Sequence, residues 1–139
     1  MNIALMAHDG KKELMVQFCI AYCGILAGHS ICATNTTGRL VAEATGLPIT
    51  LYLSAAQGGS QQMGARIMYN EIDLVLYFCD PAGKESDEPI NEIARLCDQY
   101  NIPVATNIAT AEVIITALDR GDLDWREFIN PHSAYNAKK

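Results

Sequence analysis

The sequence predicts an α/β fold in three layers, in which a mostly parallel five-stranded sheet carries helices on both faces. Short apolar runs alternate along the chain with longer segments of helical period. This alternation is typical of β-α-β units, whose strands are buried on both sides. The length of 139 residues lies in the usual range for one domain. We therefore expect a single domain over residues 1–139.

Each strand is expected where a short apolar run occurs, and each helix where apolar residues recur at helical spacing. The expected strands are NIALMA (2–7), SICAT (30–34), PITLYL (48–53), IDLVLYF (72–78) and IPVAT (102–106). The expected helices follow them in turn, at Lys11–Leu26, Thr37–Thr45, Gln61–Asn70, Pro89–Tyr100 and Ala109–Leu118. The tail LDRGDLDWREF, with Trp125 between charges, packs either on its own domain or on a neighbour.

Composition and charge exclude several classes of protein. No apolar run is long enough for a membrane span, and the first residues lack the features of a signal peptide. The five cysteines are odd in number and contain no C-x-x-C pair, which favours structural thiols in a reducing compartment. A net charge of −6 without a basic run argues against nucleic acid as a partner. We expect a cytoplasmic protein that binds neither membrane nor nucleic acid.

The loops that follow the expected strands are polar and rich in small residues. Parallel sheets bind ligands at the carboxyl ends of their strands, so chemistry is expected in these loops. The segment TNTTG (34–38) places hydroxyls and amides at a helix N-terminus, where free N–H groups and the helix dipole favour a phosphate. Lys12 supplies a compensating positive charge, and Asp9 and Asp80 place carboxylates at strand ends. A phosphorylated small molecule is the predicted ligand.

Each of these features also has a simpler interpretation. Thr36 and Thr37 are common helix N-caps, and Gly58-Gly59 is a common turn. His8 can serve only to bond a neighbouring backbone group, and Asp80 can cap a turn. The functional interpretation depends on all of these residues meeting at one edge of the sheet.

Five segments of the chain resemble, in order, the methylglyoxal synthase family. They are IALMAHDGKK, ATNTTGRLVAEATG, GGSQQMGARI, IDLVLYFCDP and YNIPVATNIATAE, and the similarity continues into LDRGDLDWREFINP. The resemblance implies a homohexamer that eliminates phosphate from dihydroxyacetone phosphate without a cofactor. No metal site is expected.

The resemblance also implies which residues form the site. The implied phosphate-binding residues are His8, Lys12, Thr34, Thr36, Thr37 and Ser54, with Ala55, Gly58 and Gly59 in the adjoining loop. The implied catalytic positions are His8 and Asp9 at the mouth, Asp80, which matches an active-site aspartate of the family, and the substituted positions Ser60 and Asp87.

The departures from the family pattern fall where a proton is handled. The family loop reads G-G-D-Q-Q with the aspartate as catalytic base, and this chain has Ser60 there. Asp87 stands in the place of a family histidine, Ile90 in that of a second aspartate, and Ala55 in that of a glycine. A serine hydroxyl cannot replace a carboxylate as a general base near neutral pH. An ionised Asp87 would repel a developing enediolate.

Two functions therefore remain open from the sequence. The first is a methylglyoxal synthase or related carbon–oxygen lyase, weak or altered, with Asp80 or Asp87 as a relocated base and Ser60 as a hydrogen-bond donor. The second is a non-catalytic binding or regulatory module that binds inorganic phosphate or a small phosphorylated metabolite. Loss of one proton-handling group costs about 10²–10⁴ in rate, so three changes can remove most of the activity.

Overall fold

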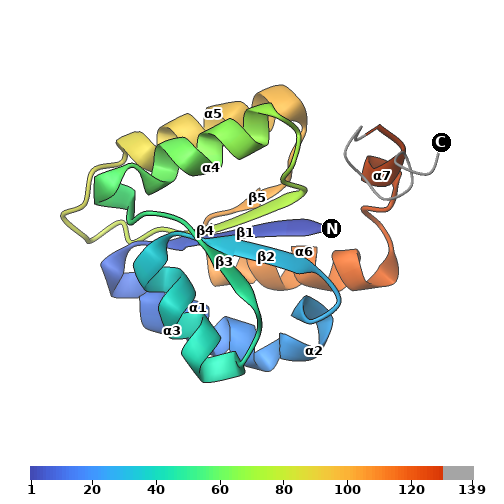
Figure 1. Cartoon of the computed structure of the whole chain (residues 1–139), viewed down its shortest axis with the longest axis horizontal. Coiled ribbons are helices and arrows are strands. Elements are labelled where there is room, and N and C mark those ends of the chain that lie inside the picture. Colours follow the sequence, from blue (N-terminus) through green and yellow to red (C-terminus); the bar gives the residue numbers. More distant parts are fainter. Residues whose placement is uncertain (130–139) are drawn as a thin grey trace.

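A five-stranded parallel sheet with the order β3-β2-β1-β4-β5 lies at the centre of the computed structural model, which describes residues 1–129 (Figure 1). The strands are β1 (Asn2–Ala7), β2 (Ser30–Ala33), β3 (Ile49–Leu51), β4 (Leu74–Phe78) and β5 (Val104–Ala105). The chain moves outward from β1 to β2 and β3, then returns to the other side of β1 for β4 and β5. The predicted parallel sheet is confirmed.

Helices cover both faces of this sheet, as the alternating pattern predicts. The longer helices are α1 (Lys12–Ala21), α3 (Asn35–Thr45), α4 (Gly59–Met68), α5 (Glu88–Tyr100) and α6 (Ile108–Arg120). The shorter elements are the 3-10 turns η1 (Asp9–Lys11) and η2 (Ala55–Gln57) and the helices α2 (Cys23–Leu26) and α7 (Trp125–Ile129). Helices α4 and α5 lie on one face, and α1, α3 and α6 lie on the other (Figure 1).

Alternate side chains of β1 build the two cores. Ile3 and Leu5 belong to the core shared with α1, α3 and α6, whereas Ala4 and Met6 belong to the core shared with α4 and α5. All four are at most 2% exposed, as expected for a central strand of a parallel sheet. The strand ends on the same side of the sheet as β2 and β4, with Ala7 paired to Phe78.

Several predicted elements differ from the structure in their bounds or caps. The helix expected over Lys11–Leu26 is interrupted at Tyr22, whose φ of −109° and ψ of 22° depart from helical values. The cap of α3 is Thr34 and not Thr36 or Thr37, which lie inside the helix. Strands β3 and β5 are shorter than expected because only the residues that pair with β2 and β4, respectively, form the ladder of hydrogen bonds.

The C-terminal segment packs on its own domain through Arg126. This side chain is fully buried, and its Nε lies 3.3 Å from Asp73 Oδ1. Its other nitrogens donate to the carbonyls of Asn101 at 2.6 Å and Ile72 at 3.4 Å. The alternative of packing on the own domain is thereby confirmed for α7, while Asn130 and Pro131 of the tail motif lie outside the described residues.

Within residues 1–129, no helix combines the length and the apolar character that crossing a membrane requires.

Candidate phosphate site at the carboxyl edge of the sheet

A cavity of about 280 Å³ lies at the carboxyl ends of the central strands. This edge is a position at which parallel sheets bind ligands, because loops from several strands converge there. The lining residues come from β1 and β4, from the first turns of α1 and α3, and from the segments that follow β1, β2, β3 and β4. They are Met6, Ala7, Asp9, Lys12, Thr34, Thr36, Thr37, Ser54, Ala55, Ala56, Tyr77 and Glu85. We call this space the strand-end cavity.

Seven of the residues predicted from the sequence therefore line one cavity: Asp9, Lys12, Thr34, Thr36, Thr37, Ser54 and Ala55.

The N-terminus of α3 opens onto the strand-end cavity. Thr34 caps the helix in an extended conformation without a side-chain cap bond, and Thr36 and Thr37 follow in the first turn. The first N–H groups of a helix have no carbonyl partner inside the helix. The Thr37 hydroxyl is also buried, with the residue 1% exposed, and finds no hydrogen-bond partner among the described residues. A buried polar group without a partner is rare and calls for an explanation, for which a bound anion is well suited.

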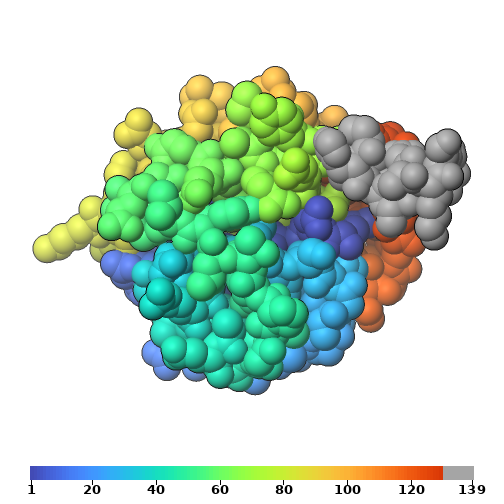
Figure 2. All heavy atoms as spheres, in the orientation of Figure 1, coloured from blue at the N-terminus to red at the C-terminus, as the bar shows by residue number. Residues whose placement is uncertain are grey.

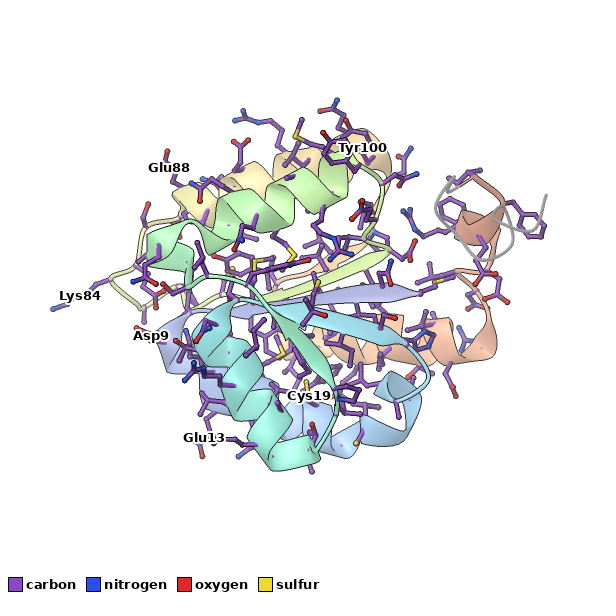
Figure 3. All side chains as sticks on the ribbon, in the orientation of Figure 1. Asp9, Glu13, Cys19, Lys84, Glu88 and Tyr100 are labelled. Atoms are coloured by element: carbon purple, nitrogen blue, oxygen red, sulfur yellow. The ribbon has the colours of Figure 1, made fainter. Side chains whose placement is uncertain are left out.

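Lys12 brings the positive charge to this cavity. Its Nζ donates to the Ala7 carbonyl and to Asp9 Oδ1, both at 2.8 Å. The hydrogen bond from Lys12, with the attraction of its charge, lowers the pKa of the Asp9 carboxyl below its usual value. Asp9 lies at the end of the sheet where the polar loops gather (Figure 3). The ammonium group is held by two acceptors, and Lys12 lines the same cavity as the first turn of α3.

His8 forms hydrogen bonds through its backbone N–H, which donates to the Phe78 carbonyl, and through one ring nitrogen. The backbone N–H of Asp80 donates to His8 Nδ1 at 2.8 Å, which assigns the proton of the neutral ring to Nε2. Nε2 is buried and has no hydrogen-bond partner among the described residues. Neither His8 nor Asp80 lines the strand-end cavity. Asp80 packs instead against Gly10, where a Cβ would collide with its carboxylate, and accepts from the N–H of Ala82 at 3.0 Å.

The glycine pair shapes the loop that follows β3. Gly58 has a φ of 104°, and a Cβ at Gly59 would collide with the Leu53 carbonyl oxygen. Both positions therefore require glycine for conformation or for space, and neither lines the strand-end cavity. A direct role of Gly58 and Gly59 in binding stays a prediction.

Ser60 lies in the next hollow and not in the strand-end cavity. It lines a groove of about 550 Å³ between α4 and α5, which meets the strand-end cavity at Ala55. Its hydroxyl is buried, with the residue 8% exposed, and has no partner among the described residues. Ser60 therefore places a neutral hydroxyl in the groove, whereas Lys12 and Thr37 line the strand-end cavity.

Asp87 and Ile90, the other two positions predicted to be substituted, lie outside the strand-end cavity. Asp87 is the exposed residue that precedes α5, and it does not line the strand-end cavity. Ile90 is 8% exposed and belongs to the core under α4 and α5. Asp80 or Asp87 could take a proton from a ligand in the strand-end cavity only if its side chain moved toward that ligand, since neither residue lines the cavity.

Two polar residues that line the strand-end cavity, Tyr77 and Glu85, escaped the sequence prediction. Glu85, in the loop after β4, accepts from the backbone N–H of Asp9 at 2.6 Å through Oε1. This loop projects from one end of the molecule, where Lys84 extends outward (Figures 2 and 3). Tyr77 of β4 is 3% exposed, and burial, with the charges of Cys79 and Glu85, raises its pKa to about 12. The polar composition of the loop could have identified Glu85 as a candidate site residue. Tyr77 lies inside the apolar run IDLVLYF, which predicts only a buried strand residue.

Within residues 1–129 no group of three or more His, Cys, Asp or Glu side chains is arranged to hold a metal ion.

Comparison with known proteins gives one consistent result. The family model described as MGS-like domain matches residues 15–106. A methylglyoxal synthase of Caldicellulosiruptor saccharolyticus is 60% identical over 132 residues, covering 94% of each chain. One of Geobacillus thermodenitrificans is 48% identical over 140 residues, covering 100% of this chain and 97% of the relative. The crystal structure of methylglyoxal synthase from Elizabethkingia anophelis superposes with a TM-score of 0.74 at 38% identity, over 82% of this chain and 76% of that one.

Proposed function

This chain belongs to the methylglyoxal synthase family, and on that premise we propose that it binds dihydroxyacetone phosphate in the strand-end cavity and eliminates phosphate from it slowly. One observation carries the proposal: the lysine, the helix N-terminus and the unpartnered Thr37 hydroxyl meet in one cavity. These are the groups with which proteins commonly hold a phosphate.

The reaction needs a base, hydrogen-bond donors for the enediolate, and a positive charge that offsets the departing phosphate. A base removes a proton from the hydroxymethyl carbon beside the carbonyl, and donors stabilise the resulting enediolate oxygen. The C–O bond to phosphate then breaks as the terminal hydroxyl gives its proton to the departing phosphate and becomes an aldehyde. The enolate that remains takes up a proton on its terminal carbon to give methylglyoxal. Atoms balance, since dihydroxyacetone phosphate yields methylglyoxal and inorganic phosphate alone.

Phosphate binding is supported by the residues that the chain retains. Lys12 is placed to offset the charge of the ester and of the departing phosphate, and the first turn of α3 offers Thr36 and Thr37. Such charge-assisted contacts contribute about 1.5–3 kcal/mol each.

The rate is expected to be low because the family's base is absent. Ser60 carries a hydroxyl in place of the carboxylate, and Asp87 and Ile90 replace two further ionisable groups. The loss of a proton-handling group costs about 10²–10⁴ in rate, and losses within one catalytic unit are not additive.

A second candidate is a phospho-ligand receptor without turnover. It is favoured by the position of Ser60 in the neighbouring groove, outside the strand-end cavity. Assembly as a homohexamer and a cytoplasmic location are further proposals, which rest on the resemblance and on the cysteine usage.

Calorimetric titration with dihydroxyacetone phosphate and inorganic phosphate, with methylglyoxal assayed in the same samples, tests the proposal. Saturable binding with methylglyoxal formed above the protein-free rate supports the slow lyase. Binding without product supports the receptor. Absence of binding by both ligands contradicts the phosphate site itself.

A further inference from the structure

The strand-end cavity contains a carboxylate at a position that the family resemblance does not assign. Glu85 lies in the loop between β4 and α5 and lines the cavity together with Lys12 and Thr37. Its Oε1 accepts the N–H of Asp9 at 2.6 Å, which fixes the side chain at the mouth. Within residues 1–129, its second oxygen accepts no hydrogen bond. Glu85 therefore combines an anchored carboxylate with an oxygen that can take a proton.

The other carboxylates near the edge are less suited to take a proton. Asp9 also lines the cavity, but the hydrogen bond from Lys12 lowers its pKa and so weakens it as a base. Asp80 packs on Gly10 and accepts from the N–H of Ala82. Asp87 lies outside the cavity lining. Among the described carboxylates, Glu85 is the one that lines the cavity without an ion pair to a lysine or arginine.

We propose that Glu85 is the general base of this site, taking over from a new position the proton transfer that Ser60 cannot perform. The inference rests on the proposed function, because it names the group that acts on the same substrate in the same cavity. With the phosphate held by Lys12 and the first turn of α3, Glu85 removes the proton from the hydroxymethyl carbon. The C–H bond breaks, its electron pair forms the enediolate, and the carboxylate becomes a carboxylic acid.

Tyr77 supplies the matching donor. It lines the same cavity, and its hydroxyl is protonated at neutral pH, as an ordinary tyrosine is. Burial, with the charges of Cys79 and Glu85, raises its pKa further, to about 12. A neutral phenol can donate to the enediolate oxygen as negative charge develops there. Tyr77 and Glu85 both line the strand-end cavity, so the donor and the base face the same space.

After phosphate leaves, the product still needs a proton on its terminal carbon. The carboxylic acid formed at Glu85 can return the proton it removed, which restores the ionised base for the next cycle. No oxidant, metal or second substrate enters this sequence.

The alternative use of Glu85 is as an obstruction. In that role the negative charge of the carboxylate at the mouth of an anion site would repel phosphate and weaken its binding. The two roles predict opposite changes in turnover when the charge is removed, and this difference makes the proposal testable.

The experiment compares the full-length protein with Glu85→Gln, Glu85→Asp and the matched control Glu88→Gln. Glu88 is an exposed residue at the start of α5, and its replacement removes the same charge close by without touching the strand-end cavity. Circular dichroism confirms folding, calorimetry gives the affinity for inorganic phosphate, and initial rates give kcat and KM for dihydroxyacetone phosphate.

We expect Glu85→Gln to lower kcat by about 10²–10⁴, with phosphate bound at least as tightly as by the wild type. Glu85→Asp keeps a carboxylate and retains part of the rate, and Glu88→Gln keeps all of it. An unchanged or higher kcat in Glu85→Gln overturns the proposal and makes Glu85 an obstruction. A wild type that binds phosphate without forming methylglyoxal also overturns it, while leaving the phosphate site intact. A wild type that binds neither ligand removes the proposed function and the inference together.

Discussion

Replacing Lys12 with methionine separates binding from stability at the strand-end cavity. Methionine keeps much of the length of the side chain and removes its charge. Lys12 Nζ donates to the Ala7 carbonyl and to Asp9, and it lines the cavity that we assign to phosphate. The substitution therefore removes one anion contact, one hydrogen bond and one ion pair.

The magnitudes of these losses differ. The Asp9 side chain is 83% exposed, so its ion pair with Lys12 contributes at most about 1 kcal/mol to stability. The bond to the Ala7 carbonyl adds about 1 kcal/mol. A charge-assisted contact with bound phosphate contributes about 1.5–3 kcal/mol, which corresponds to a loss of affinity of about 10- to 150-fold.

We therefore expect Lys12→Met to bind inorganic phosphate at least about 10-fold more weakly, while its melting midpoint falls by only a few degrees. Calorimetric titration and thermal unfolding at one pH measure both quantities. Lys11→Met is the matched control, because Lys11 carries the same charge at the adjacent position and does not line the cavity. Equal affinities in Lys12→Met and Lys11→Met would refute the assignment of Lys12 to the anion.

Three further predictions follow from the same structure. Thr37→Val removes a buried hydroxyl without a partner among the described residues, so we expect stability to rise by about 1 kcal/mol while phosphate affinity falls, as measured by thermal unfolding and titration. Arg126→Met removes the guanidinium that Asp73 faces in the core, and we expect urea unfolding to show a loss of about 3–5 kcal/mol. The pKa of Asp9 is lowered by Lys12 from 3.8, so its contribution to stability is present above that value and is lost as pH falls through the lowered pKa. Melting curves of wild type and Asp9→Asn should therefore differ slightly at neutral pH and converge in strong acid.

One control variant and three contradicting outcomes test these predictions. Arg120→Met removes a surface ion pair with Asp122, and its unfolding curve should nearly coincide with that of the wild type. A similar loss in both arginine variants would show that the buried contacts of Arg126 are not special. Weaker stability in Thr37→Val would mean that the hydroxyl has a partner in the folded protein. A difference between wild type and Asp9→Asn that grows as the pH is lowered would contradict the sign of the Asp9 effect.

The fold was predictable because it depends on periodicity and order. Short apolar runs and helical segments alternate in the sequence, and the strand β1 (Asn2–Ala7) coincides with its apolar run NIALMA. The interruption at Tyr22 was not predictable, since the apolar spacing continues through it and only the local backbone angles change. Helix α7 is five residues long, too short to show a period. The sequence pattern around Arg126 predicts an exposed charged side chain, whereas the structure buries it.

The placement of the candidate site residues was predictable where they follow the ends of parallel strands. Thr34 and Thr37 follow β2 and Lys12 follows β1, so the parallel sheet brings them to one edge. Glu85 was not predictable by this reasoning, because it lies within a long loop and meets Asp9 across 76 positions of sequence. The position of Ser60 in the neighbouring groove depends on how the turn at Gly58 directs the start of α4, which composition does not encode.

The location of bound phosphate tests the central claim most directly. Isotope-labelled protein titrated with inorganic phosphate and followed by amide resonances reports each backbone N–H separately. We expect saturable shifts concentrated at Asp9, Thr36 and Thr37, which surround the strand-end cavity, with a smaller response in the same titration of Lys12→Met. Shifts that are absent, or that concentrate elsewhere on the protein, would contradict the assignment of this cavity to phosphate.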